Sequence, residues 1–387
     1  MGFIAAAVAT FAAITAQSKP PDSGHLAASI DKAAAATIAA HQSPGLQVAV
    51  IKDGRVILVK SYGSANLEQA VPVSNDSVFR VGSVTKQFTA AALLLLAEEG
   101  KLSLQDKLSK YYANFPRADD INLEEMLHHT SGIHSYTSEP AFANDGMVHR
   151  STDEMVEYIK KMPKTQDFEP GTDWSYSNSA YFILGGVVEK VSGSPLAQVF
   201  QSRFFTPIGM AHSALDDEAE IVLGRVRGYS GTAPGKFSNA PFISMTIPGA
   251  AGSVRSTASD LAKWNAALFG GKVLTAASLT AMLTPGRLNN GDTTGAAMAK
   301  MMAAAGEPAD AQSVKKEYGY ALFISQEEGH RKIDHGGGIY GFSASLSEFP
   351  DDKTTVVVLS NAIGKDVGVT EIADRIERLA VGLPPKK

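Results

Sequence analysis

The sequence predicts an α/β (α+β) fold in which an antiparallel sheet is flanked by helices and interrupted by a mostly helical insertion. Strand patterns occur near the N-terminus and return from Tyr318 onward, whereas helices and loops dominate from about 103 to 245. The 387 residues are 44% hydrophobic and 19% charged, so the chain can bury a large core. We therefore expect a single catalytic domain over 17–387, with an α/β part at about 25–102 and 246–387.

Apolar periodicity and turn residues place the elements of the α/β part. An amphipathic pattern predicts a helix near each end, and alternating or continuous apolar runs predict strands between turn signals. The expected elements are, in chain order, a helix carrying Leu26, Ile30 and Ile38, a hairpin of 46–51 and 56–62 joined by Lys52-Asp53-Gly54, strands at 343–349 and 354–359 separated by Pro350-Asp351-Asp352, and a last helix near 369–381.

A fully buried helix is predicted at 87–99, because this run is apolar on every side and ends at Gly100. The tetrapeptide that begins at Ser83 has the pattern SxxK and opens this helix. The pattern also begins at Ser29, inside a polar-faced Ala-rich helix, and at Ser313, in a charged stretch ahead of a strand. Its position makes Ser83 the candidate nucleophile of the three.

The first turn of a buried helix suits acyl transfer. Free N–H groups and the helix dipole favour an oxyanion beside Ser83, and Lys86 at i+3 lies on the same helix face. Burial would lower the pKa of Lys86 and make a neutral amine available as a base. The alternative is an ordinary N-cap serine followed by a surface lysine.

The motif Tyr176-Ser177-Asn178 ends a turn-rich loop at 168–178 and enters an apolar helix from about 180 to 191. A phenol on such a loop can face a cleft, where a nearby ammonium would favour the phenolate and let it carry protons. Asn178 is a candidate donor to a substrate carbonyl, and helix capping is an equally open role for it. The same pattern at Tyr112 lacks this setting.

Three consecutive glycines follow His335 inside a predicted sheet. Glycine weakens a strand unless something approaches the backbone closely, and a substrate is a suitable candidate. The N–H of Gly338 would then complete an oxyanion hole with the N–H of Ser83. The alternative is a glycine bulge with a solvated histidine.

These motifs, in this order, resemble the serine β-lactamase and penicillin-binding-protein superfamily. The resemblance is nearest to the branch of class C β-lactamases, DD-carboxypeptidases, D-aminopeptidases and family VIII carboxylesterases, and it runs from about Pro44 to Asn361. The segments 79–83 and 126–133 and the Pro170-Gly171 pair also match. The resemblance implies a β-lactamase/transpeptidase-like fold with Ser83 as the acylated nucleophile, Lys86 and Tyr176 as the proton-transfer pair, Asn178, His335 and Gly337 as substrate-binding residues, and the N–H groups of Ser83 and Gly338 as the oxyanion hole.

One departure from the family narrows the activity. β-Lactamases and many penicillin-binding proteins carry Lys-Thr-Gly where His335-Gly336-Gly337 stands here, and a histidine supplies at best a part-time charge near pH 7. Glu169 lies in a loop that does not match the class A deacylation segment. We therefore expect a serine hydrolase that forms an acyl-enzyme on small esters or amides, with D-amino-acid peptides among the candidates. A slow-turnover penicillin- or muropeptide-binding sensor and a true β-lactamase are the alternatives.

Composition limits the partners. A net charge of −5 gives no reason to expect nucleic acid, and the absence of cysteine excludes disulfides, zinc–thiolate sites and a thiol nucleophile. His128-His129 lacks HExxH spacing, so we expect no metal and no cofactor, and this pair is expected to anchor a loop. The oligomeric state is left open.

Two further segments carry expectations. The apolar run Phe3 to Ala16 resembles the core of a secretory signal, although no basic residue precedes it, so 1–16 is expected to direct the protein to the periplasm or outside the cell. It is too short to span a bilayer. The Met-rich stretch Leu288 to Gln312 is expected to be either a mobile lid or a surface helix and loop without catalytic consequence.

Overall fold

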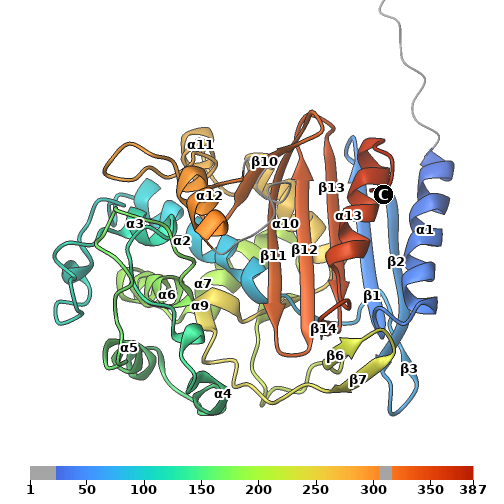
Figure 1. Ribbon diagram of the computed structural model, residues 1–387, viewed down its shortest axis with the longest axis horizontal. Coiled ribbons are helices and arrows are strands. Elements are labelled where there is room, and N and C mark those ends of the chain that lie inside the picture. The colour runs from blue at the N-terminus through green and yellow to red at the C-terminus, as the bar shows by residue number, and fades with distance from the viewer. Residues whose placement is uncertain (1–22, 305–315, 387) are drawn as a thin grey trace, which may run out of the picture.

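The computed structural model describes residues 23–304 and 316–386, and it has an eight-stranded antiparallel sheet at its centre (Figure 1). The strand order is β3-β2-β1-β13-β12-β11-β10-β9, so the first hairpin pairs with strands from the end of the chain. The strands are β1 (Gly45–Lys52), β2 (Arg55–Asn66), β3 (Val71–Pro72), β9 (Glu317–Tyr318), β10 (Phe323–Glu327), β11 (His330–Ile339), β12 (Phe342–Phe349) and β13 (Thr354–Ser360). This arrangement confirms the predicted fold class.

Helices cover both faces of the sheet, as Figure 1 shows. The terminal helices α1 (Ser23–Ala39) and α13 (Thr370–Val381) pack together on one face, where Val356 and Val358 belong to their apolar cluster. The alternate residue Val357 faces the other side and belongs to the larger core. The period-2 alternation of side chains along β13 therefore divides its residues between two hydrophobic layers.

The larger core joins the sheet to the helical part of the chain. The helices of this part and of the second layer are α2 (Thr85–Glu98), α3 (Leu123–Leu127), α4 (Phe142–Asp145), α5 (Thr152–Lys160), α6 (Asn178–Ser192), α7 (Leu196–Phe200), α8 (Thr206–Ile208), α9 (Gly249–Gly252), α10 (Ala258–Phe269), α11 (Ala276–Met282) and α12 (Thr294–Ala304). Helix α2 is buried almost throughout and contacts α6 and α9, as its uniformly apolar sequence predicts. None of the helices in the described ranges is long and apolar enough to cross a membrane.

Two small sheets were not expected from the sequence. One has the order β14-β6-β7, with β6 (Tyr229–Ala233), β7 (Lys236–Asn239) and β14 (Ala362–Gly364). The other has the order β4-β8-β5, with β4 (Phe79–Arg80), β5 (Ala214–Leu215) and β8 (Val254–Ser256). These strands are too short to show periodicity, and long-range pairing rather than local pattern forms them. Strand β4 leads directly to the turn that carries Ser83.

Some expectations fall wholly or partly outside the described residues. The expected signal at 1–16 lies there, as do Ser313 and the end of the Leu288–Gln312 stretch. Within the described part of that stretch, Leu288 and Met298 are buried against Trp174 and Tyr318.

Candidate active site

Ser83, Lys86 and Asn178 meet where α2, α6 and α9 converge. Ser83 lies in a 3₁₀ turn, η1 (Gly82–Val84), immediately before α2, rather than in the first turn of the α-helix itself. The Lys86 Nζ atom lies 3.2 Å from Ser83 Oγ, 2.7 Å from Asn178 Oδ1 and 2.8 Å from the carbonyl oxygen of Ala251. Ala251 in α9, which no sequence motif marks, thus completes the site with its backbone carbonyl.

The three contacts of Lys86 Nζ match the bonding capacity of a neutral amine. Asn178 Oδ1 and the Ala251 carbonyl can only accept, so they take two N–H bonds from the lysine. In a neutral amine the remaining position is a lone pair, and it is left for the Ser83 hydroxyl to donate to. The Lys86 side chain therefore sits as a base would have to sit toward this serine.

Burial favours the neutral form of this lysine. Lys86 has no exposed surface, and desolvation holds its pKa well below the usual range. The rings of Tyr176 and Tyr181 lie 4.7 and 5.5 Å from Nζ, and no carboxylate pairs with it in the described part of the chain. Aromatic faces stabilise a cation much less than a carboxylate does, so desolvation dominates.

The Tyr176 hydroxyl is buried and has no hydrogen-bond partner in the described structure. Burial raises the pKa of Tyr176, and the nearby Ser83 hydroxyl only partly offsets this rise, although the two hydroxyls do not meet with hydrogen-bond geometry. The expected phenolate is therefore wrong, because burial disfavours the charged form of this phenol. Tyr176 carries its proton and has an unused donor at Ser83.

Asn178 does not cap its helix. The Ser177 side chain accepts from the N–H of Ala180 and is the N-cap of α6, which leaves Asn178 free to bond Lys86. The Asn178 Nδ2 group donates to Thr137 Oγ1 at 3.0 Å. Since an amide nitrogen has two hydrogens, one donor is left that faces no protein acceptor in the described ranges.

The glycines after His335 allow β11 to touch the turn of the nucleophile. A Cβ atom on Gly337 would lie 1.9 Å from the Val81 carbonyl oxygen and 3.2 Å from the Ser83 nitrogen. A Cβ atom on Gly82, whose φ is +51°, would lie 2.8 Å from the Gly338 nitrogen. The close approach that three glycines predict is thus an approach by protein backbone, and it holds the Ser83 and Gly338 segments against each other.

His335 is buried at 3% exposure and does not present a charge to the cleft. Desolvation, which the hydrogen bond to the Gly336 carbonyl opposes, lowers its pKa to about 3. The expected part-time charge at this position is therefore wrong. The ring lies 6.1 Å from that of Tyr176 and forms part of its packing surface.

A chain of hydrogen bonds runs behind Tyr176 and fixes the state of both histidines. The Ser177 N–H donates to His129 Nδ1 at 3.1 Å, so the proton of this ring is on Nε2, which is 3.1 Å from Tyr318 Oη. The Tyr318 hydroxyl must then donate to His335 Nε2 at 3.3 Å, which places the His335 proton on Nδ1, 2.6 Å from the Gly336 carbonyl. We call this sequence of bonds the histidine relay. These tautomers follow from the bonding pattern.

The histidine relay joins three separate segments around the phenol. His129 lies 4.4 Å from the Tyr176 ring, and its carbonyl also accepts from the Ser175 N–H. The loop-anchoring role expected for the His128-His129 pair is confirmed for His129. Tyr318 and Thr137 were not predicted for the site, since no local pattern marks them.

Replacing Tyr318 with Phe tests the histidine relay. The change keeps the ring that packs on Phe323 and removes the hydroxyl, which leaves His129 Nε2–H and His335 Nε2 unpaired. We expect a loss of about 1–3 kcal/mol in the free energy of unfolding and a changed ¹⁵N chemical shift of His335 Nε2, which loses its donor while Nδ1–H keeps the Gly336 carbonyl. Tyr111→Phe, which removes a hydroxyl bonded to Asp106 elsewhere, is the control and should not change this shift. An unaltered His335 spectrum in Tyr318→Phe would contradict the relay.

Gly337→Ala tests the contact between β11 and η1. The added methyl would overlap the Val81 carbonyl oxygen, so the strand must move away from Ser83. We expect hydrolytic activity to fall about 100-fold or more, measured as kcat/KM, because misplacement by 1 Å is costly in a preorganised site. In the control Gly336→Ala the methyl would meet nothing nearer than 3.6 Å, and activity should stay within a few-fold. Equal effects of the two changes would disprove the proposed constraint.

Comparison with known proteins agrees with this geometry. The family model described as Beta-lactamase matches residues 30–380. Penicillin-binding protein 4* of Bacillus subtilis is 28% identical over 334 residues, covering 83% of this chain and 68% of that protein. An octameric penicillin-binding protein homologue from Pyrococcus abyssi superposes with a TM-score of 0.75 at 26% identity, covering 95% of this chain and 79% of that one.

A D-stereospecific amidohydrolase from Streptomyces gives a TM-score of 0.70 at 25% identity, covering 87% of this chain and 94% of that one. The resemblance inferred from the ordered motifs is thus confirmed over a longer stretch than the motifs themselves span. With its antiparallel sheet, its helical insertion and a match over 30–380, the chain belongs to the Beta-lactamase family.

Proposed function

We propose that this protein is a serine hydrolase that forms a covalent acyl-enzyme at Ser83 from small esters or amides. The observation that carries this proposal is the bonding of Lys86 Nζ, whose two N–H donors are occupied and whose third position faces Ser83 Oγ at 3.2 Å. A buried amine with a lowered pKa, one hydrogen bond from a hydroxyl, is the arrangement that general-base activation of serine requires.

In the proposed acylation step, Ser83 Oγ attacks the substrate carbonyl carbon while its proton passes to Lys86 Nζ. The carbonyl oxygen gains the negative charge and is stabilised by the N–H groups of Ser83 and Gly338. The carbon–heteroatom bond of the leaving group then breaks, and the leaving group takes a proton. Tyr176, protonated and unpartnered, is placed to pass this proton from Lys86 and regain its own.

Deacylation uses the same groups in reverse. Water replaces the leaving group, gives its proton to the Tyr176–Lys86 pair and attacks the ester carbon, and Ser83 Oγ recovers the proton as the carboxylic acid departs. The free amide N–H of Asn178 supports binding of a carbonyl on the substrate during both steps. Slow deacylation would turn the same site into a trap, so the balance between turnover and trapping is part of the test.

The substrates proposed are esters and D-amino-acid amides or peptides rather than β-lactams. Support comes from the D-stereospecific amidohydrolase of the same fold and from the neutral, buried His335 in place of a family lysine. Without that lysine the site lacks the fixed cation that would hold a carboxylate beside the leaving group. We also propose export from the cytoplasm, for which the apolar Phe3–Ala16 run is the support.

Ser83→Ala tests the nucleophile. The variant should keep its fold and lose at least about 10³-fold in kcat for a para-nitrophenyl ester, because the covalent route is removed. Intact-mass spectrometry should detect an acyl adduct on the wild type and none on the variant. Ser29→Ala, which removes the hydroxyl of the SxxK copy in α1, is the matched control and should behave as wild type. Turnover that survives in Ser83→Ala would refute the assignment, and a stable adduct without turnover would favour a sensor.

The pH dependence of activity tests the state of Lys86. Because burial lowers the pKa of this amine, its neutral fraction is already large well below pH 10.5 and decreases as the pH falls through the folded-state pKa. We expect kcat/KM for a neutral ester to rise with pH along this ionisation and then level off. In Lys86→Met, kcat/KM should fall about 10²–10⁴-fold, and its rise with pH should disappear. A wild-type profile that rises only near pH 10.5 would show that Lys86 is not the base.

A further inference from the structure

We propose that the acyl part of the substrate carries an anionic group, which binds in a pocket lined by four arginines. This inference rests on the proposed function. The pocket, here called the arginine pocket, is a cavity of about 290 Å³ lined by Arg80, Arg225, Arg227, Arg255, Tyr340 and Phe342, among others.

The arginine pocket lies on the acyl side of the nucleophile. The leaving group must receive its proton from Tyr176, and this residue packs against His335 near one end of the β11 segment that borders Ser83. The acyl group therefore extends the other way along β11, past Gly338. Tyr340 is two residues beyond Gly338, in the turn that follows the last residue of β11, and it lines the pocket.

Two further contacts connect this end of the cleft with the arginine pocket. Arg80 in β4 is three residues before Ser83 and lines the pocket wall. The Tyr340 ring lies 6.2 Å from that of Phe142, which in turn lies 5.5 Å from Tyr136 in the loop that positions Asn178. The aromatic side chains thus bridge the sheet side and the helical side of the cleft beside the pocket.

One buried carboxylate organises the arginines but does not use all their donors. Asp216 has no exposed side-chain surface and accepts from Arg80 Nε at 2.9 Å, from Arg225 Nη1 at 2.8 and 3.0 Å, and from Arg255 Nη1 at 3.1 Å. Four bonds fill the four lone-pair sites of a carboxylate. Arg227 bonds Asn239 instead, through Nε at 3.1 Å.

The terminal amino groups of Arg80 and Arg227 are left without a protein acceptor in the described ranges. The Arg80 side chain is 18% exposed and lines the cavity, so a ligand there can reach its free donors. A guanidinium with a free edge binds a carboxylate or phosphoryl group with two parallel bonds, which makes an anion the fitting ligand.

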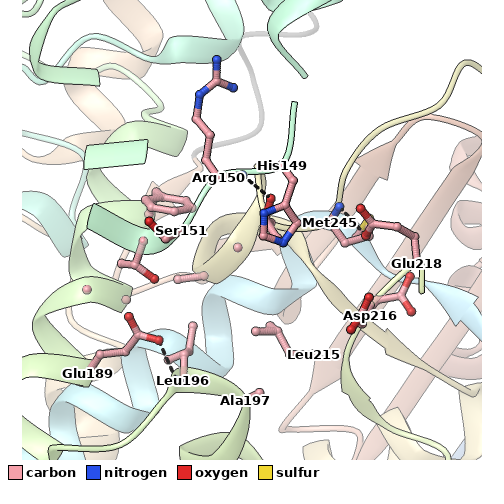
Figure 2. Close-up of a pocket in the computed structure, with 18 residues that line it drawn as sticks. His149, Arg150, Ser151, Glu189, Leu196, Ala197, Leu215, Asp216, Glu218 and Met245 are labelled. Atoms are coloured by element: carbon pink, nitrogen blue, oxygen red, sulfur yellow. Dashed lines mark hydrogen bonds between the residues drawn. The ribbon is translucent and has the colours of Figure 1, made fainter. Parts of the chain in front are cut away.

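The charge of the lining points the same way. Four arginines and one carboxylate, that of Asp216, line the arginine pocket, and Glu220 pairs with Arg255 at 2.8 Å from outside the lining, so two positive charges remain in excess. A separate cavity of about 300 Å³, shown in Figure 2, also reaches Asp216 but is lined by Glu189, Asp217 and Glu218. Figure 2 labels Asp216, Glu218 and Glu189 among the residues that line it. An anionic group is thus attracted to the first cavity and repelled from the second.

Apolar surface completes the arginine pocket. The Arg80 guanidinium lies 6.0 Å from the centre of the Phe342 ring, and Phe242 lines the rim with 54% of its surface exposed. A ligand with an apolar linker between the scissile carbonyl and its anion would cover this surface. The substrate class proposed is therefore an ester or amide whose acyl chain ends in a carboxylate or phosphoryl group.

Paired esters test this inference. The probes are the para-nitrophenyl monoester of glutaric acid, its phosphonate analogue, and the neutral valerate ester, with kcat/KM measured for each. We expect wild type to prefer an anionic ester by about tenfold or more over valerate, and the preference to decrease with salt. Comparison of the two anionic esters shows whether carboxylate or phosphoryl is the better ligand. A preference that is absent, or unaffected by salt, would overturn the inference.

Arg227→Gln is the variant of choice, because Arg227 is exposed and has no bond to Asp216, so its loss should not disturb folding. The ratio of anionic to neutral kcat/KM should fall several-fold. The control Arg55→Gln removes an equal charge at the exposed first residue of β2 and should leave the ratio unchanged. Arg55 is far from the pocket, because Arg227 N–H bonds the carbonyl of Ala65, ten residues further along the same strand. Equal ratios in wild type and Arg227→Gln would overturn the inference.

Binding without catalysis separates the two proposals. In Ser83→Ala, glutarate should raise the Tm and neutral glutaramide should not, and adding Arg227→Gln should abolish the shift. If no ester is turned over yet this shift is seen, the proposed hydrolase function fails and the arginine pocket stands. If esters are turned over without charge preference and no shift is seen, the pocket fails and the hydrolase stands.

Discussion

The desolvation of Lys86 is the constraint on which the site depends. A lysine with no exposed surface and no carboxylate partner is costly as an ammonium, so the fold must supply acceptors for its two remaining N–H groups. It does so with Asn178 from α6 and the Ala251 carbonyl from α9. These two helices therefore have to converge on α2. The protonation state of the lysine thus depends on how the three helices pack.

The N-terminal half of α2 shows how this convergence is built. Thr89 Oγ1 donates to the Ala250 carbonyl at 2.7 Å, and Thr85 Oγ1 accepts from the Val254 N–H at 2.9 Å, on either side of the Lys86 contact with Ala251. Three polar side chains from the first turns of this helix thus hold a single segment. Each such buried bond is worth about 1 kcal/mol, but each buried group left unpaired would cost more, so the segment has one position.

The sequence allows the groups at Ser83 to be predicted because they sit in local patterns. Each of these patterns can be recognised within about fifteen residues of sequence: the buried helix, the glycine run and the turn-rich loop before Tyr176. Ala251 contributes only a backbone carbonyl, which every residue type has, so no pattern can mark it. Tyr318 and His129 are 189 positions apart, and only the completed sheet brings them together.

Burial is the second quantity that motifs do not give. A histidine in place of a lysine suggests a partial charge, but His335 belongs to the closed side of β11, where desolvation and the histidine relay keep it neutral. Tyr176 is affected in the same way, since burial raises the pKa of its phenol and keeps the proton on it. Both corrections follow from the burial of these groups, which residue types alone do not reveal.

Because His335 is neutral, the leaving-group side of the cleft has no fixed charge there, and the arginines lie on the acyl side. Electrostatic selection of a substrate requires a charge that is fixed and that the protein's own carboxylates have not fully neutralised. Near His335 the lowered pKa excludes this. Around Asp216 three guanidinium groups meet Asp216 and Glu220, and Arg227 adds a fourth guanidinium, so positive charge remains in excess. Asp216 follows β5 and bonds Arg80 of β4 and Arg255 of β8. The ion-pair cluster that holds β4, the strand before Ser83, therefore also presents its spare donors to the acyl side. Substrate selection is thereby moved from the leaving group to the acyl group.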